Sequence, residues 1–505
     1  MFAKVNTFGL TGLSAFQVTV ESSTEKGTPD FKISGLGDAS VQESRQRVLA
    51  AMENSGFPAD KLRAVVNLSP ADVKKSGSLY DFPILVSILA SLGEIALPAE
   101  DWAFIGELSL SGELTATNGV LPIADSARKC GIKRIFVPEA NVREATLVHG
   151  IEVYGIRDIA QLAAFLSGKR ALRPAAPFEP EPEDLLRGSD FADVRGQENI
   201  KIAIQTAAAG FHNLLMIGPP GSGKSMLAKR IPGVLPPMTF EESMETTAVY
   251  SVAGLLDKSS PFISARPFRP VGHTASAAGI VGGGRTPSPG EISLAHNGVL
   301  FLDELPEFRR DVLEALRQPL EDKKTVITRA SGKTTYPCKT MLTAAMNPCP
   351  CGNNGSEGKC SCSEAAIAKY LGKISRPVLD RIDIQVEVRA VAYDQLRSEE
   401  QGMSSAEMRE NIQKARELQK ERFKGTGLLF NSEIPPDKLR EFCVMDDGAE
   451  EFLRNTFDSL GLSARAYDRI LKVARTVADI DGSRIIQRKH ISRAVQYRTL
   501  DRKYW

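Results

Sequence analysis

Residues 213–225 contain the pattern that most limits how this chain can fold. A short apolar run leads into Gly218, and the pattern G-x-x-x-x-G-K-S then ends at Lys224 and Ser225. This order predicts a buried strand, a loop whose backbone N–H groups surround phosphate, and a helix whose N-terminus favours the same anion. The expected phosphate loop consists of Gly218, Pro219, Pro220, Gly221, Ser222 and Gly223.

A second apolar run, at residues 298–302, ends in two acidic residues, Asp303 and Glu304. Such a strand would deliver Asp303 to a Mg²⁺ ion that Ser225 also ligates, while Lys224 reaches the β- and γ-phosphates. Glu304 is expected to polarise the attacking water as a general base. Because Glu304 has no role in binding alone, the two motifs together predict ATP hydrolysis with ATP and Mg²⁺ as cofactors.

The overall charge restricts how the chain can contact a partner. With 63 basic and 62 acidic residues the formal charge is +1, so any contact with nucleic acid must come from local basic patches. The longest apolar stretch, residues 82–90, is shorter than the roughly 20 residues of a membrane helix. The first residues show no signal-peptide pattern. We therefore expect a cytoplasmic protein without membrane contact.

A proline-rich segment predicts the clearest boundary in the chain. Because proline fixes φ and lacks an N–H, residues 169–186 are expected to form an extended linker. Residues 1–168 alternate β-branched runs with helical patterns, which predicts an α/β domain. Residues 187–395 carry the phosphate motifs, and residues 396–505 show a charged helical pattern that predicts a smaller helical domain. The expected strands include 64–68 and 134–138, and the expected helices 39–55 and 156–167.

At this point the sequence resembles a known family. Residues 190–383 are similar to AAA+ ATPases of the magnesium-chelatase-like branch, and the whole chain resembles the YifB/ComM family. The segments that carry this resemblance are 212–221, 289–308 and 345–352. It implies an α/β fold with an AAA+ P-loop core and a helical lid, assembled into a ring that is hexameric in similar proteins.

The same resemblance implies roles for three more residues. Asn347 matches sensor 1, a polar group near the γ-phosphate and the attacking water. Arg381 matches the arginine finger, which stabilises transition-state charge in the site of a neighbouring subunit. Arg465 matches sensor 2 on the helical lid. Each arginine could instead form an ordinary surface ion pair.

Four cysteines lie close together in the sequence. They form two C-x-C pairs, whose four thiolates could enclose a tetrahedral Zn²⁺ in a closed, structural site. Free thiols are the alternative. The four are Cys349, Cys351, Cys360 and Cys362.

Two segments are expected to face DNA. Residues 324–336 predict a β-hairpin with Arg329 and Lys333 near its tip. The resemblance implies that it projects into the ring pore, where a positive tip can grip phosphates without reading sequence. A solvated turn is the alternative. Residues 267–285 match the other pore-side element, but Gly272-His273 replaces the usual His-His pair, so we expect His273 to be an ordinary loop residue.

The N-terminal domain resembles the proteolytic domain of Lon proteases, which has a ribosomal-S5-domain-2-like fold. Residues 106–113 and 131–141 carry this similarity. The Lon reaction needs a nucleophilic serine and a lysine base. Residues 78–83 lack the serine-containing turn, and Leu121 stands where the lysine would be. We therefore expect a scaffold that is not a protease.

Together these features favour an ATP-hydrolysing ring motor that acts on single-stranded or branched DNA. The resemblance implies a helicase or branch-migration role in recombination or DNA uptake. The alternatives are the ATPase subunit of a metal chelatase and an ATP-dependent unfoldase.

Overall fold

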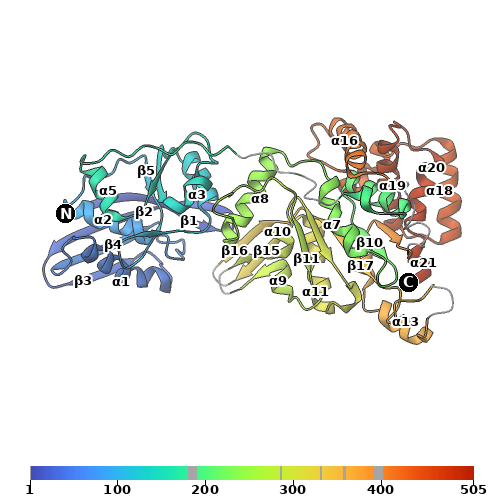
Figure 1. Ribbon diagram of the computed structural model, residues 1–505, viewed down its shortest axis with the longest axis horizontal. Coiled ribbons are helices and arrows are strands. Elements are labelled where there is room, and N and C mark those ends of the chain that lie inside the picture. The colour runs from blue at the N-terminus through green and yellow to red at the C-terminus, as the bar shows by residue number, and fades with distance from the viewer. Residues whose placement is uncertain (1, 180–189, 285–286, 330–331, 356–359, 391–401) are drawn as a thin grey trace.

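The computed structural model describes residues 2–179, 190–284, 287–329, 332–355, 360–390 and 402–505, and these form three regions along one axis (Figure 1). A mixed sheet with helices lies at one end, a parallel sheet lies in the middle, and a group of helices lies at the other end. No helix of the described residues is long and apolar enough to cross a membrane.

The N-terminal region is built on a seven-stranded mixed sheet in the order β3-β4-β2-β1-β5-β8-β9. Strands β1 and β2 pair antiparallel, as do β2 and β4, whereas the remaining neighbours are parallel. The expected strands at 64–68 and 134–138 and the helix at 39–55 are confirmed, and the second expected helix begins at Ile159. The elements are β1 (Phe2–Thr11), β2 (Ser14–Lys26), β3 (Asp30–Ser34), α1 (Ala39–Asn54), β4 (Leu62–Ser69), α2 (Asp81–Leu92), β5 (Trp102–Phe104), β6 (Glu107–Leu108), β7 (Leu114–Thr115), α3 (Val120–Lys129), β8 (Arg134–Pro138), α4 (Val142–Ala145), β9 (Glu152–Ile156) and α5 (Ile159–Leu166).

The central region contains a five-stranded, fully parallel sheet in the order β11-β14-β17-β10-β18. Its strands β10, β14 and β17 are buried along their whole length, as strands covered on both faces are. Since the strands are parallel, all their carboxyl ends meet at one edge.

The two strands expected from apolar runs are confirmed as β10 and β14, and the expected hairpin is confirmed as β15 and β16. The elements of this region are α6 (Glu198–Gly210), β10 (Leu214–Ile217), α7 (Lys224–Val234), α8 (Phe240–Ala253), β11 (Phe268–Val271), α9 (Ala277–Val281), β12 (Gly282–Gly283), β13 (Ser288–Pro289), α10 (Glu291–Leu294), β14 (Val299–Leu302), α11 (Arg310–Ala315), α12 (Arg317–Asp322), β15 (Lys324–Arg329), β16 (Gly332–Pro337), β17 (Met341–Met346), α13 (Glu364–Leu371), α14 (Arg376–Leu379) and β18 (Ile384–Glu387).

The C-terminal helices share one hydrophobic core with the central sheet. That core joins residues of α6 and β10 to residues of α16 and α19, so apolar burial fixes these helices against the sheet. The helices are α16 (Ser405–Arg422), α17 (Leu439–Phe442), α18 (Asp447–Leu460), α19 (Ala464–Ile480), α20 (Arg488–Gln496) and α21 (Leu500–Tyr504).

A buried polar chain crosses the same contact. His212 Nδ1 lies 3.2 Å from Asp383 Oδ2, and His212 Nε2 lies 2.8 Å from the Thr476 hydroxyl on α19. Burial alone would raise the pKa of Asp383, but the bond to His212 and the charges of Arg469 and Lys472 lower it to about 2. The ionised carboxylate therefore ties the start of β18 to the C-terminal helices.

The N-terminal region is held to the centre through helix α8. The buried Glu144 carboxylate accepts hydrogen bonds from the Ser251 hydroxyl on α8 and from the Leu121 backbone N–H at 2.8 Å, in the first turn of α3. Arg143 donates to the Ser259 carbonyl at 2.7 Å. The described start of the proline-rich segment also lies against this region, where the Ala175 N–H donates to the Val153 carbonyl at 2.8 Å.

Replacing Asp383 by Asn should lower stability in a pH-dependent way. The carboxyl pKa falls from its ordinary 3.8 to about 2 in the folded chain, so its stabilisation is present above about pH 4 and is lost as pH falls toward 2. We expect the variant to lose about 2 kcal/mol at pH 7 and about half as much at pH 3. Urea unfolding followed by circular dichroism measures this.

Asp468→Asn, which changes a carboxylate on α19, is the matched control. A difference between wild type and Asp383→Asn that stays constant with pH would contradict the assigned role of the ionised carboxylate.

Candidate nucleotide site

The expected phosphate loop follows β10 at the carboxyl edge of the central sheet. Its glycines are required by the backbone, because Gly221 and Gly223 have φ values of +76° and +87°. A Cβ on Gly218 would lie 2.1 Å from the Val388 carbonyl oxygen, so this position has no room for a side chain. The local sequence therefore folds as its motif predicts.

Lys224 begins helix α7 and is folded back onto its own loop. Its Nζ donates to the carbonyls of Gly218 and Pro219, both at 2.8 Å, and to Asn347 Oδ1 at 3.2 Å. Burial lowers the pKa of Lys224, while the Asp303 carboxylate opposes that change. Asn347 follows β17, so the loops after two neighbouring strands meet at this ammonium group.

The two residues expected to ligate Mg²⁺ are in direct contact. The Ser225 hydroxyl donates to Asp303 Oδ2 at 2.7 Å, which joins the start of α7 to the end of β14. Hydroxyl and carboxylate oxygens suit Mg²⁺, and the glycine-containing loop leads into the N-terminus of α7, which favours a phosphate. These residues fit Mg²⁺ and ATP, which when bound would supply the phosphoryl group and the cation that neutralises its charge.

Glu304 follows Asp303 in an unusual backbone conformation. Its φ is +54°, in the left-handed region that residues with a side chain rarely adopt. Such strain is found where the surrounding structure fixes a functional residue. In this conformation Glu304 joins the end of β14 to a short 3₁₀ helix at Leu305–Glu307.

His273 contacts this expected general base. Its Nδ1 lies 3.2 Å from Glu304 Oε2, with both side chains about half exposed. The contact arises because β11 and β14 are parallel neighbours, with Val271 opposite Leu302, so the residues that follow each strand meet. This contact was not predicted from the sequence, because His273 was expected to be an ordinary loop residue and strand β11 was not expected. The signal in the sequence that could have located this contact is a short strand that ends at the apolar Val271, directly before Gly272 and His273.

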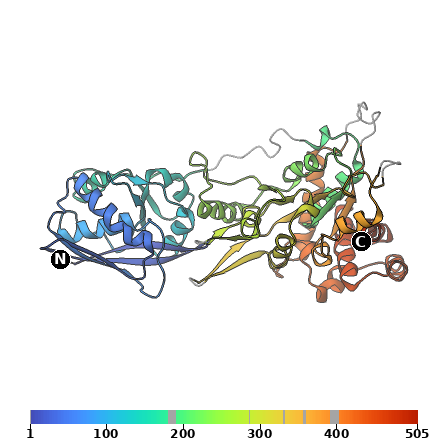
Figure 2. The same cartoon turned by 90° about the horizontal axis from the view of Figure 1, so that it is seen from below.

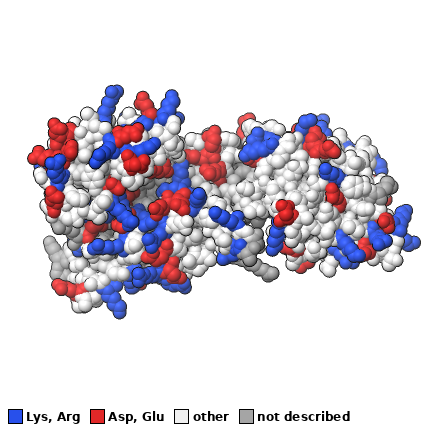
Figure 3. Space-filling model, turned by 180° about the vertical axis from the view of Figure 1, so that it is seen from behind, with Lys and Arg blue, Asp and Glu red and all other residues white. Residues whose placement is uncertain are grey.

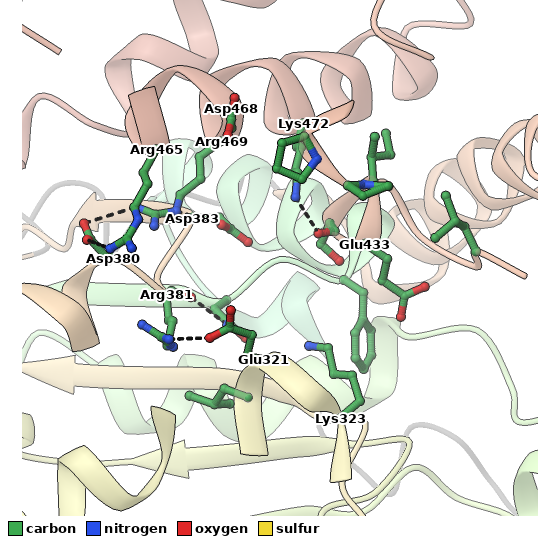
Figure 4. Close-up of a pocket in the computed structure, with 18 of the residues that line it drawn as sticks. Glu321, Lys323, Asp380, Arg381, Asp383, Glu433, Arg465, Asp468, Arg469 and Lys472 are labelled. Atoms are coloured by element: carbon green, nitrogen blue, oxygen red, sulfur yellow. Dashed lines mark hydrogen bonds and ion pairs between the residues drawn. The ribbon is translucent and has the colours of Figure 1, made fainter. Parts of the chain in front are cut away.

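Arg381 and Arg465 lie at the other edge of the sheet. Arg381 Nε donates to the Arg317 carbonyl at 3.1 Å and its guanidinium pairs with Glu321, while Arg465 Nη1 lies 3.1 Å from Asp380. Both line a pocket of about 640 Å³ next to Asn213, the residue before β10 (Figure 4). The structure thus brings Lys224, Ser225, Asp303, Glu304 and Asn347 together and places the two arginines apart from them.

The pocket is lined by charges of both signs. Figure 4 shows Arg465 and Arg469 directed from α19 toward Asp380, and Arg381 directed toward Glu321. Burial lowers the pKa of Lys472, although the Asp383 carboxylate opposes this effect. The described lining contains no residue of the phosphate loop.

Arg329 and Lys333 are exposed near the end of the β15–β16 hairpin, where Thr328 pairs with Lys333 and Arg329 with Gly332. Residues 330 and 331, at the turn between the two strands, lie outside the described residues. Figure 2 shows this hairpin extending from the central region beside the N-terminal region. Figure 3 shows acidic and basic side chains interspersed on the face that it views, so positive charge there is local.

The part of the N-terminal domain that corresponds to a Lon active site has other contacts. Leu121 is buried in an apolar core, and the Ser78 hydroxyl bonds to Glu107. The buried Asp81 carboxylate pairs with Arg47 at 2.6 Å. The described residues at these positions therefore show no serine–lysine pair.

Known protein families match the chain in three places. The family model of magnesium chelatase, subunit ChlI, matches residues 190–396, that of subunit ChlI of Mg-chelatase matches 20–141, and that of the ChlI C-terminal region matches 402–498. The fold and the site thus define a magnesium-chelatase-like AAA+ ATPase, and this class implies ATP hydrolysis.

Individual relatives narrow the family further. YifB of Escherichia coli strain K12 is 41% identical over 504 residues, covering 99% of this chain and 97% of that protein. Competence protein ComM of Haemophilus influenzae is 40% identical over 499 residues, covering 97% of this chain and 96% of that protein. The chain belongs to the YifB/ComM family. Lon protease 2 of Bacillus subtilis is 30% identical over 172 residues, covering 32% of this chain and 30% of that protein.

Replacing His273 by Ala should raise the basal rate of ATP hydrolysis. The change frees the Glu304 carboxylate from a half-exposed contact with the imidazole, which is worth up to about 1 kcal/mol, so kcat should rise about two- to five-fold. KM for ATP should stay unchanged, because His273 does not line the phosphate loop. Steady-state phosphate release measures both constants.

His149→Ala, which changes an exposed histidine of the N-terminal region, should leave kcat unchanged. His273→Ala combined with Glu304→Gln should be inactive while still binding nucleotide. An unchanged or lower kcat in His273→Ala would show that the contact does not restrain Glu304.

Proposed function

We propose that this chain is an ATP-driven ring motor that moves along DNA, with a helicase or branch-migration role in recombination or DNA uptake. The main support for a ring is the separation of Arg381 and Arg465 from the phosphate loop of the same chain. Asn213 precedes β10 and lines the arginine pocket, whereas the phosphate loop follows β10. A four-residue strand at about 3.3 Å per residue places the two sites about 13 Å apart along the sheet.

An arginine finger must come within hydrogen-bond distance of the phosphoryl group. Arg381 lies at the amino edge of the sheet. It therefore cannot reach a phosphate bound to its own chain unless the strands between the two sites unfold. A second copy whose phosphate loop faces the pocket would complete both sites. This supports trans action by Arg381 and also by Arg465, which then serves the same neighbouring nucleotide. A head-to-tail contact of this kind closes into a ring, for which we propose six subunits.

The resting contacts of these arginines suit this arrangement. Glu321 and Asp380 hold Arg381 and Arg465 as ion pairs, and a triphosphate would compete for both guanidinium groups. Lys224 likewise donates to carbonyls that a phosphate oxygen would replace. Nucleotide bound between two copies therefore exchanges contacts within a chain for contacts between chains.

The exposed cations of the β15–β16 hairpin support DNA as the partner. Arg329 and Lys333 can contact backbone phosphates without reading bases. The neighbouring hairpin, β12–β13, contains Gly283, where a Cβ would lie 3.5 Å from Arg329 Nη2. The Tyr336 hydroxyl also donates to the Pro287 carbonyl at 2.9 Å, so the two hairpins pack together. The name of the relative ComM, a competence protein, agrees with a role in DNA uptake.

The chain connects these hairpins to the catalytic residues. The β15–β16 hairpin leads into β17, which Asn347 directly follows, and His273 precedes α9, which leads into β12. Movement at the hairpins would therefore reach sensor 1 through β17 and Glu304 through His273. In the other direction, hydrolysis would move the hairpins along the DNA.

We assign four parts to the chain in this proposal. Residues 1–168 form a Lon-like, ribosomal-S5-domain-2-like domain that acts as a scaffold without proteolysis, and residues 169–186 form the linker. Residues 187–395 form the AAA+ core, and residues 396–505 form the helical lid. The Glu144 contact to α8 supports a scaffold that is fixed to the core and not loosely tethered.

The magnesium-chelatase matches favour a second function, the ATPase of a metal chelatase. Such an enzyme needs partner subunits and a tetrapyrrole, so its ATPase rate would respond to those and not to DNA. The response of the ATPase rate to DNA therefore separates the motor from the chelatase function.

Mixing two inactive variants should restore ATP hydrolysis. Lys224→Ala removes a phosphate contact, and Arg381→Ala removes the finger, so each alone should be inactive. If the finger acts in trans, a mixed ring contains interfaces with both residues intact, and mixing should recover about a quarter of the wild-type rate by random assembly. Mixing Lys224→Ala with Glu304→Gln, two changes in one site, should recover much less. Absence of recovery in the first mixture would contradict trans action.

Single-stranded DNA should stimulate ATP hydrolysis through the hairpin. Arg329→Ala/Lys333→Ala should keep the basal rate, lose stimulation, and reduce the slope of log affinity against log salt by about 1.4. Lys414→Ala/Arg454→Ala removes two other exposed cations and is the matched control. Glu304→Gln should remove hydrolysis with or without DNA. A wild-type rate indifferent to DNA but raised by a porphyrin with chelatase partners would favour the second function.

A further inference from the structure

The four clustered cysteines converge on one point in space. Their sulfur atoms all lie within 4.8 Å of one another, with Cys349 to Cys360 at 3.8 Å and Cys351 to Cys360 at 3.7 Å. Zn–S bonds of about 2.3 Å in a tetrahedron place neighbouring sulfurs about 3.8 Å apart. Disulfide bonding requires about 2.05 Å, which none of these contacts approaches. The fourth sulfur belongs to Cys362.

Backbone N–H groups are directed at two of these sulfurs. The Asn354 N–H donates to Cys349 Sγ at 3.3 Å, and the N–H groups of Asn353 and Ser361 are directed to Cys351. Backbone N–H groups stabilise negative sulfur and orient it toward a metal. Cys349 is buried, while the other three are partly exposed, so an ion can reach the site.

The cysteine loop also packs on the phosphate loop. Gly352 has φ +81°, and a Cβ there would lie 2.4 Å from Pro220 Cδ, so its backbone rests directly on the proline ring. The Gly352 N–H donates to the Cys349 carbonyl at 3.0 Å, which makes this contact part of the turn that carries two of the sulfurs. Cys349 in turn stands two residues after Asn347, whose side chain contacts Lys224.

We propose that Cys349, Cys351, Cys360 and Cys362 bind one Zn²⁺ ion, and that the metal-closed loop braces the phosphate loop through the contact of Gly352 with Pro220. Four protein ligands leave no open position, so the ion is structural and not catalytic. Binding replaces four thiol protons by the metal and joins both ends of the loop at one point. The brace then fixes Pro220. It also fixes the position of Asn347, whose side chain accepts a hydrogen bond from Lys224.

Metal analysis tests the site itself. Purified full-length chain, kept reduced, should contain about one zinc per chain, as should Cys130→Ser, which changes an exposed cysteine outside the cluster. Cys351→Ser/Cys362→Ser should lose the zinc. Co²⁺ added to zinc-free wild-type protein should give the visible absorption of tetrahedral cobalt–thiolate. A wild-type chain that holds no metal and shows no such absorption overturns the proposal.

Two glycine variants test the brace separately. Gly352→Ala should retain zinc but bind nucleotide about ten-fold more weakly, because the new methyl group displaces Pro220. Gly355→Ala is the matched control, since its φ is +86° and, among the residues that the structure describes, only the Lys503 ammonium lies within 4 Å of its Cβ position, at 3.8 Å. Equal nucleotide affinity in these two variants, with zinc retained, overturns the brace.

Zinc removal tests the coupling without a substitution. Dialysis against a chelator should weaken nucleotide binding, and added Zn²⁺ should restore it, while circular dichroism confirms that the chain remains folded. The nucleotide is titrated without DNA, so the outcome does not depend on the proposed motor function. Unchanged nucleotide affinity in the folded, zinc-free chain shows that the metal does not support the phosphate loop.

Discussion

The parallel alignment of the central strands is the constraint on which the rest of this structure depends. Because β10, β14 and β17 run in one direction, the phosphate loop, Asp303 and Asn347 meet at one edge although they are far apart in sequence. The same alignment sends Arg381 and Arg465 to the opposite edge. Buried apolar strands hold this geometry, and the contact of Asp383 with His212 fixes the C-terminal helices at the second edge. One sheet therefore carries the phosphate-loop residues at one edge and the arginine pocket at the other.

Several functional side chains of the single chain are occupied by internal partners. Lys224 donates to its own loop, Glu304 contacts His273, and Arg381 pairs with Glu321. The contacts of Glu304 and Arg381 are partly exposed, and exposed charged contacts are worth only about 0–1 kcal/mol. Lys224 is buried, and it donates to backbone carbonyls that phosphate oxygens can replace. Nucleotide and a neighbouring copy would provide stronger, charge-assisted partners. In the proposed ring, assembly would therefore supply the partners that efficient ATP hydrolysis needs.

The regions outside the central sheet are joined to the nucleotide site and its supporting helices by short, direct contacts. The Glu144 carboxylate joins the N-terminal region to α8, the cysteine loop rests on Pro220, and the two hairpins lead back to His273 and Asn347. Burial raises the pKa of Glu144, which its hydrogen bonds partly offset, so that carboxylate is stabilised only while its partners stay in place. Distant parts of the chain are thus linked to the nucleotide site by packing and hydrogen bonds, without long flexible connections in the described residues.

The sequence by itself determined the motifs whose chemistry is local: the phosphate loop, the acidic pair after β14, the cysteine pairs and the hairpin. In each of these motifs the residues lie close together in the sequence, so their spacing and their types are enough to predict the motif. Only the tertiary structure placed His273 against Glu304 and Gly352 on Pro220. Those contacts join loops that follow different strands, and they depend on strand order and register, which β-propensity and apolar patterns do not specify. The sequence therefore determined which groups are available, and packing of the sheet decided which of them meet.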